Sequence, residues 1–288
     1  MIIVTGASGK LGRAIVEKLL ERVPAEQMGV SVREVDKARD LADRGVRVRR
    51  GDFDDSESLL DAFEGASQVL LVSSGILGEA GIRQHRNAIN AVKKSGAARI
   101  LYTSHMGSSR ASLFPPMLHH AATEELLEQS GMPFTSLRNG FYASSLLWLI
   151  SDAITSGELL LPEDGPFAWT THSDLAEAAA AMVSQRPWDG MSPNLTASEA
   201  FDMEEVAAMT SNIIGRPIRR IVVSDEEYKE RLSAQGVPEF RLEIAMGMFL
   251  ASRRGEFAKT STALANLIGR PPVKLSNFLK EAITAPNL

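Results

Sequence analysis

Short apolar runs alternate with helical patterns along the first half of the chain. The runs are rich in Val, Ile and Leu, and the segments between them repeat apolar residues at helical spacing, as at Leu11, Ile15 and Leu19. Strands that alternate with helices indicate a parallel sheet covered by helices on both faces. The predicted strands lie at residues 1–5, 28–33, 46–53, 68–75, 99–104 and 133–139.

The polar and apolar pattern changes after Asn139. Before it, helices are predicted at residues 10–23, 35–45, 56–65, 83–96 and 123–132, the third with Ser56 as its N-cap. After it, one strong helical pattern at 173–186 is followed by short, irregularly spaced pieces. We therefore predict an α/β protein with a Rossmann-type, doubly wound parallel sheet. The predicted parts are an NAD(P)-binding domain at 1–141, on which helix 173–186 packs back, and a smaller substrate-binding α/β lobe at 142–288.

A glycine ladder follows the first predicted strand and opens the first predicted helix. Glycine is required where backbone approaches a pyrophosphate and where helix and strand cross closely, and the helix start offers free N–H groups to the phosphates. The alternative is a plain turn. We expect a bound dinucleotide, contacted by Gly6, Ser8, Gly9, Lys10, Leu11 and Gly12.

The end of the second strand bears on the choice of cofactor. Arg33 lies 21 residues after Gly12, where dinucleotide folds place the residue that reads the ribose 2′ position. A guanidinium clamps a phosphate with parallel hydrogen bonds, so NADP(H) is favoured over NAD(H). Arg13 and Lys37 would add positive charge. Glu34 could reverse the choice, and Arg33 could also be a solvated residue, so NAD(H) stays possible.

Further strand ends point to the same edge of the sheet. Ligands of open α/β sheets bind outside the carboxyl ends of the strands. Asp52 and Phe53 follow the third strand, where they would hold adenine, and Ser73 and Ser74 end the fourth, near the expected nicotinamide ribose. Each of these residues could also serve only its own turn. The other expected cofactor contacts are Val72 and Thr103.

Composition and charge exclude several classes. The 288 residues carry 31 basic and 36 acidic side chains, a net charge of −5, which favours neither nucleic acid nor an anionic membrane. The absence of cysteine excludes disulfides and thiolate metal sites, and the five histidines show no metal-binding spacing. The chain begins with a strand rather than a signal sequence, and the apolar stretch "FYASSLLWLI" is too short for a membrane span. We expect a cytoplasmic protein without metal.

Several segments together resemble a known family. "VTGASGKLG", "GDFDD", "ILYTS", "HHAATEELL", "PFTSLRNGFY" and "GEFAKTSTALANLIGRPP" are similar to the atypical short-chain dehydrogenases of the NmrA-like group, nearest the triphenylmethane reductase and NAD(P)H:quinone oxidoreductase branch. The resemblance implies a monomer or homodimer that binds NADP(H), with substrate between the sheet and the C-terminal lobe. It also implies one of two activities, either reduction of quinones or dyes, or nucleotide sensing through a protein partner.

The usual acid–base pair of short-chain dehydrogenases is missing. None of the three tyrosines is followed by lysine at the fourth position, so we expect no Tyr-x-x-x-Lys pair. Hydride transfer to a quinone or another flat, electron-poor aromatic acceptor needs less, because the cofactor supplies the chemistry. We predict this reaction; a nucleotide sensor and an aromatic polyketide tailoring enzyme are the alternatives.

Candidates for the acceptor site lie at the later strand ends. Each could instead be a packing, capping or surface residue, as Arg138 could simply pair with an acidic neighbour. The expected catalytic residues are Tyr102, Ser104, His120 and Asn139, and the expected substrate-binding residues are Gly75, His105, Phe141 and Tyr142.

Overall fold

A single parallel sheet organises the first part of the molecule. The computed structural model describes residues 1–185 and 188–285. Seven strands lie in the order β10-β6-β5-β4-β1-β2-β3, so the direction of winding reverses between β1 and β4. The doubly wound, Rossmann-type sheet predicted from the sequence is confirmed. The strands are β1 (Ile2–Thr5), β2 (Met28–Val32), β3 (Arg47–Arg50), β4 (Gln68–Leu71), β5 (Arg99–His105), β6 (Phe134–Asn139) and β10 (Gly190–Met191).

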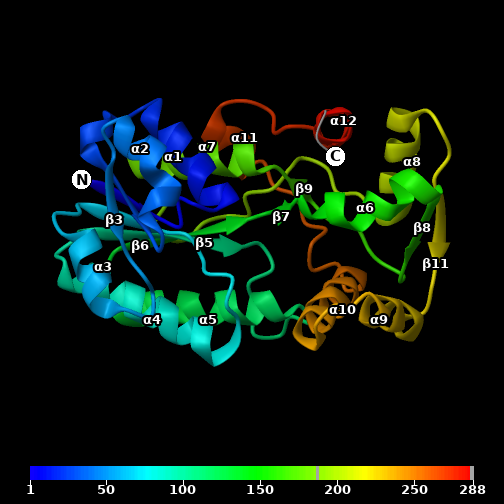
Figure 1. Ribbon diagram of the computed structural model, residues 1–288, viewed down its shortest axis with the longest axis horizontal. Helices are drawn as coiled ribbons and strands as arrows, with labels where there is room; N and C mark the ends of the chain where they lie inside the picture. The colour runs from blue at the N-terminus through cyan, green and yellow to red at the C-terminus, as the bar shows by residue number, and fades with distance from the viewer. Residues whose placement is uncertain (186–187, 286–288) are drawn as a thin grey trace.

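Helices cover both faces of this sheet (Figure 1). Alternate residues of each strand face opposite sides, so Val4 belongs to one core and Ile3 to the other. The first face carries α1 (Lys10–Leu20), α2 (Arg39–Asp43), α7 (His172–Gln185) and α11 (Ala263–Ile268). The second face carries α3 (Ser56–Phe63), α4 (Gly78–Lys94) and α5 (Pro115–Ser130).

Two local predictions need correction. The N-cap of α3 is Asp55 rather than Ser56, because the Asp55 carboxylate accepts the Ser58 N–H at 3.2 Å and also pairs with Arg50 at 2.6 Å. The helix predicted at 35–45 is divided into a 3₁₀ turn, Val35–Ala38, and the short α2. In the helix predicted at 173–186, residue 186 lies outside the described residues.

The remaining elements form a second part with its own core. Phe141, Phe167, Trp169 and Phe257 pack together in it. Two pairs of parallel strands belong here, β7 with β9 and β8 with β11. The elements are β7 (Phe141–Tyr142), α6 (Ser145–Ser156), β8 (Glu158–Leu161), β9 (Trp169–Thr170), α8 (Met203–Ile214), β11 (Arg219–Val222), α9 (Asp225–Ala234), α10 (Glu239–Arg253) and α12 (Leu275–Thr284).

The chain passes between the two parts more than once. It enters the second part at β7, returns to the first sheet as α7 and β10, and returns again as α11. α7 packs against α1, and α11 packs against α7 (Figure 1). Among the described residues, no helix is both long enough and apolar enough to cross a lipid bilayer.

Candidate functional site

The glycine ladder forms a compact turn between β1 and α1. Gly6 has a φ of +64°, its N–H donates to the Ser31 carbonyl at 3.1 Å, and its carbonyl accepts the Gly9 N–H at 2.9 Å. A Cβ on Gly12 would lie 2.2 Å from the Gly6 carbonyl oxygen. Gly6 therefore supplies a left-handed backbone conformation, and Gly12 allows helix and turn to touch.

The start of α1 is suited to an anion. Gly9 is the N-cap, no side chain caps the helix, and no acidic residue lies in its first turn. The first N–H groups of α1 thus keep their partial positive charge for a ligand. Ser8 and Lys10 are exposed at this turn, and Leu11 is buried beneath it. These residues fit a dinucleotide pyrophosphate.

The end of β2 presents a cation, Arg33. Arg33 is exposed directly after β2, and its guanidinium has no partner among residues 1–185 and 188–285. Lys37 is bonded to Glu34 at 2.7 Å, and this hydrogen bond lowers the pKa of Glu34. Arg13 is paired with Glu17 and Asp40. Of the three predicted cations, Arg33 is the one whose guanidinium has no partner within the described ranges, so it is available to a phosphate.

Asp52 and Phe53 lie between β3 and α3. Both are half-buried. Asp52 Oδ1 accepts the Asp54 N–H at 3.0 Å, which forms a local turn, and the Phe53 carbonyl accepts a bond from Asn87 at 3.0 Å. The Phe53 ring meets the edge of His85, with ring centres 6.1 Å apart. Phe53 therefore lies beside the segment that ends β4.

Side chains hold the backbone just after β4. The N–H groups of Val72, Ser73 and Ser74 donate in turn to Thr5 Oγ1 at 2.9 Å, Thr103 Oγ1 at 2.9 Å and His85 Nε2 at 3.0 Å. Three different elements thus fix three consecutive residues at the switch point of the sheet. Gly75, the next residue, is exposed.

The hydrogen bonds of His85 define its tautomer. Its Nδ1 lies 2.7 Å from Thr123 Oγ1, and that hydroxyl donates to the His119 carbonyl at 3.0 Å. Because the Thr123 proton is used there, the His85 Nδ1 carries hydrogen and its Nε2 accepts from Ser74. Burial lowers the pKa of His85 well below its usual value, which keeps this acceptor available.

Tyr102 and His120 form a second bonded pair beside Ser73. The Tyr102 hydroxyl lies 2.8 Å from His120 Nδ1 and 3.3 Å from Ser73 Oγ. Tyr102 is fully buried, and burial raises its pKa, so the phenol stays protonated. When it donates to His120, the imidazole carries its hydrogen on Nε2. Burial also lowers the pKa of His120.

His105 is a second neutral imidazole. Its Nδ1 accepts the Gly107 N–H at 3.1 Å, which leaves hydrogen on Nε2. Burial lowers the pKa of His105 to about 3. The ring stacks on His120 at 6.3 Å and meets the edge of Phe141 at 5.5 Å. Phe141 is 5% exposed within the aromatic core, and Tyr142 packs on His172.

Two predicted catalytic residues have different surroundings. Ser104 donates to Glu124 at 2.8 Å in a buried network, and Arg138 also binds that carboxylate. Burial would raise the pKa of Glu124, but these hydrogen bonds bring it below its usual value. The Ser104 hydroxyl therefore has no donor left for a substrate. Asn139 is 2% exposed, and its Oδ1 has no hydrogen-bond partner among the described residues.

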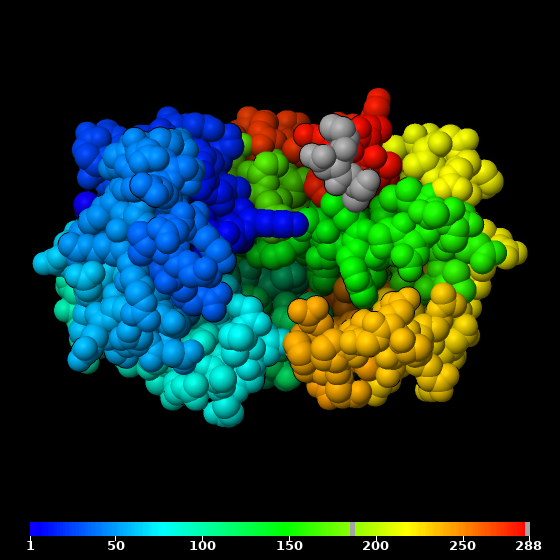
Figure 2. All heavy atoms as spheres, viewed as in Figure 1, coloured from blue at the N-terminus to red at the C-terminus, as the bar shows by residue number. Residues whose placement is uncertain are grey.

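The structure brings Ser73, Tyr102, His105 and His120 together, whereas Ser104 faces the Glu124 network. Figure 2 shows a hollow between the blue and cyan segments and the green and orange ones. Despite the clustered histidines, no group of three or more metal-ligating side chains is placed to hold an ion in the described part of the chain.

Sequence reasoning missed the residues that support the site. Thr5 precedes the first glycine in "VTG". A hydroxyl at the end of a strand is the sequence feature that could have indicated its role as a hydrogen-bond acceptor. His85 and Thr123 are separated by 38 residues, and their contact depends on the packing of α4 against α5. We know of no local pattern that would have indicated it.

Comparison with known proteins gives a consistent result. The model of the NmrA-like family matches residues 1–277. Quinone oxidoreductase 2 of Escherichia coli is 32% identical over 290 residues, which cover 100% of both chains. NAD(P)H azoreductase of Xenophilus azovorans is 25% identical over 282 residues, 97% of each chain.

Solved structures agree with these similarities. NADPH-dependent quinone oxidoreductase from Escherichia coli, crystallised with NADPH, has a TM-score of 0.93 and 32% identity over 99% of this chain and 100% of that one. Citrobacter triphenylmethane reductase, complexed with NADP(H), has a TM-score of 0.92 and 34% identity over 98% of this chain and 100% of that one. The resemblance noted in the sequence is confirmed over the whole fold.

Proposed function

Because this chain belongs to the NmrA-like family, we propose that it is an NAD(P)H-dependent oxidoreductase that favours NADPH and reduces a quinone or another flat, electron-poor aromatic acceptor. The observation that carries the proposal is the fixed segment Val72–Ser74 beside an uncapped helix start. The names of the relatives, which include quinone, triphenylmethane and azo reductases, support the same class of reaction.

The cofactor would lie across the carboxyl ends of β1, β2 and β4. The start of α1 and Lys10 would bind the pyrophosphate, and Arg33 would bind the 2′-phosphate with charge-assisted hydrogen bonds. Phe53 and Asp52 would border the adenine, and Ser73 and Ser74 the nicotinamide ribose. When bound, the reduced nicotinamide supplies the hydride.

Neutral imidazoles would assist the acceptor. A quinone takes up one hydride and one proton to become a hydroquinone, and negative charge develops on its oxygen before the proton arrives. The Nε2–H groups of His105 and His120 are donors that suit this oxygen, and the protonated Tyr102 holds the second in its tautomer. Because burial lowers the pKa of both imidazoles, the two rings stay neutral and would donate hydrogen bonds to the oxygen rather than protons. Water would then supply the proton.

The test is NADPH consumption with a series of quinones, followed by absorbance of the reduced nicotinamide, with NADH in parallel. Arg33→Ala should raise the KM for NADPH about 10–100-fold, because it removes hydrogen bonds to a charged group, and should leave that for NADH unchanged. Arg86→Ala, which removes an exposed arginine on α4, is the matched control. Protein that binds NADPH but consumes none with any acceptor would reject the reductase function and favour a nucleotide sensor.

A further inference from the structure

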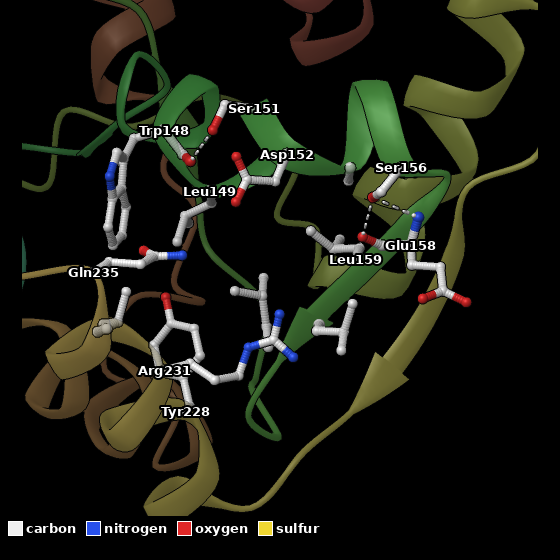
Figure 3. A pocket seen from close by; sticks show the side chains of 14 residues that line it. Trp148, Leu149, Ser151, Asp152, Ser156, Glu158, Leu159, Tyr228, Arg231 and Gln235 are labelled. Atoms are coloured by element: carbon white, nitrogen blue, oxygen red, sulfur yellow. Dashed lines mark hydrogen bonds between the residues drawn. The ribbon is translucent and has the colours of Figure 1, made fainter.

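A cavity lies in the second part of the molecule, away from the proposed cofactor site. It is open to the surface, has a volume of about 470 Å³ and is lined by α6, β8 and α9 (Figure 3). Its lining residues lie between 148 and 235, and none of them belongs to the site formed by Ser73, Tyr102, His105 and His120. This volume is in the range of small-molecule sites.

The cavity has an apolar floor and one aromatic wall. Leu149, Leu159 and Leu232 are buried and form part of the floor. Trp148 forms a wall and is 54% exposed, although a large aromatic side chain is usually more covered. An exposed indole beside a leucine floor offers a flat surface on which an aromatic ring can stack.

Polar side chains also line this cavity. Tyr228 is only 5% exposed, yet its hydroxyl has no hydrogen-bond partner in the described part of the chain. Figure 3 shows that hydroxyl and the Arg231 guanidinium directed into the cavity, with the Asp152 carboxylate above them on α6. Arg231 and Asp152 are exposed lining residues, and neither forms an ion pair within residues 1–185 and 188–285. The Tyr228 hydroxyl is accessible from the cavity and is not among the buried polar atoms that lack a partner, so a ligand would take the place of water as its hydrogen-bond partner.

We propose that this cavity binds a small planar aromatic hydroxy acid. The ring would lie against Trp148 and the leucine floor. The carboxylate of the ligand would accept hydrogen bonds from Arg231 and Tyr228, and its hydroxyl would donate to Asp152. Because no group of the proposed reductase site lines the cavity, this ligand is bound there and is not reduced. The inference is independent of the proposed reduction and goes beyond it.

The probe is 4-hydroxybenzoate, titrated into the full-length protein by isothermal calorimetry, with and without saturating NADP⁺. We expect saturable binding whose Kd is unchanged by NADP⁺. Arg231→Ala should weaken binding about tenfold or more, since it removes a charge-assisted hydrogen bond, and Tyr228→Phe about fivefold. Benzoate, which lacks the hydroxyl, should bind more weakly than the probe. The control is Arg241→Ala, an exposed cation on α10 outside the cavity, which should leave the Kd unchanged.

Three results would overturn the proposal. The first is no binding at millimolar probe. The second is binding that saturating NADP⁺ abolishes, which would place the probe in the cofactor site. The third is binding that Tyr228→Phe and Arg231→Ala leave unchanged. Misfolding does not confuse the test, because the Tyr228 hydroxyl bonds to no other described residue, and thermal unfolding of each variant verifies its fold.

Discussion

The end of β4 and the cavity beneath Trp148 differ in whether their polar groups have hydrogen-bond partners within the described protein. Between Val72 and Ser74 each N–H meets a side-chain acceptor from another element. In the cavity, the Tyr228 hydroxyl and the Arg231 guanidinium meet none in the described part of the chain. The hydrogen bonds of the first region are therefore formed within the protein before any ligand arrives, whereas the polar groups of the second would exchange water for the proposed ligand. One region of the chain thus has its hydrogen bonds in place before binding, and in the other, proposed site hydrogen bonds to the protein would form with the ligand.

The largest effect is expected at the glycine turn that supports the preorganised region. Gly12→Ala would place a Cβ 2.2 Å from the Gly6 carbonyl oxygen, and backbone cannot yield as a flexible side chain does. We expect the free energy of unfolding in denaturant to fall by about 3 kcal/mol, as for severe overpacking, together with a marked loss of NADPH affinity. Gly9→Ala is the matched control for stability, because its Cβ would meet the same oxygen at 3.4 Å. Equal stability of the two variants would contradict this account.

Acid should next lower the free energy of unfolding through His105, which stacks on His120 in the proposed acceptor site. The pKa of His105 is about 3 in the folded protein and about 6.5 in an unfolded chain. Between these values the unfolded chain binds more protons, so stability is complete above pH 6.5 and is lost as pH falls toward 3. At pH 4.5, two units below the unfolded pKa, the loss from this group is about 2.7 kcal/mol.

The check is denaturant unfolding at pH 7.5 and 4.5. His105→Asn keeps an acceptor for the Gly107 N–H but does not titrate, so it should lose about 2.7 kcal/mol less on acidification than the unaltered protein. The same acid dependence in both proteins would exclude His105 as its source.

A smaller effect is expected at His85. His85→Leu leaves the Ser74 N–H without an acceptor, which costs about 1–2 kcal/mol and should raise the Kd for NADPH roughly tenfold. His85→Gln can place an amide oxygen near the position of Nε2 and should recover most of that affinity. The KM for the quinone should change little in either variant. Equal weakening of NADPH binding by both variants would show that His85 acts only through packing.

The smallest effect on the free energy of unfolding is expected at Tyr228, in the cavity beneath Trp148. Tyr228→Phe removes a hydroxyl that has no partner among the described residues, so the free energy of unfolding should change by less than about 0.5 kcal/mol. Thermal and denaturant unfolding measure it. A loss above about 1 kcal/mol would reveal a bond to the hydroxyl in solution and would remove the contrast between the two regions.

Local sequence patterns predicted the features that depend on neighbouring residues. The parallel sheet follows from alternating apolar runs, and the turn at Gly6 from glycine spacing. The location of Arg33 at the end of β2 follows from its distance to Gly12. The N-cap at Asp55 was missed because Arg50, five residues earlier, orders that carboxylate.

Contacts between distant segments were not predictable in the same way. Tyr102 and His120 were each candidates, but their 2.8 Å contact depends on how α5 packs on β5. Ser104, two residues after Tyr102 on the same strand, was an equal candidate in sequence and instead binds the buried Glu124. Only the packing of α5 shows which partner each side chain meets.

The repeated return of the chain to the first sheet limits how this architecture can diversify. α7 and α11 cover the same face of the sheet as α1. A C-terminal half taken from a relative would therefore pack non-matching side chains against Ile15 and Leu19 of α1. Recombination at residue 142 would therefore disrupt the nucleotide-binding half as well.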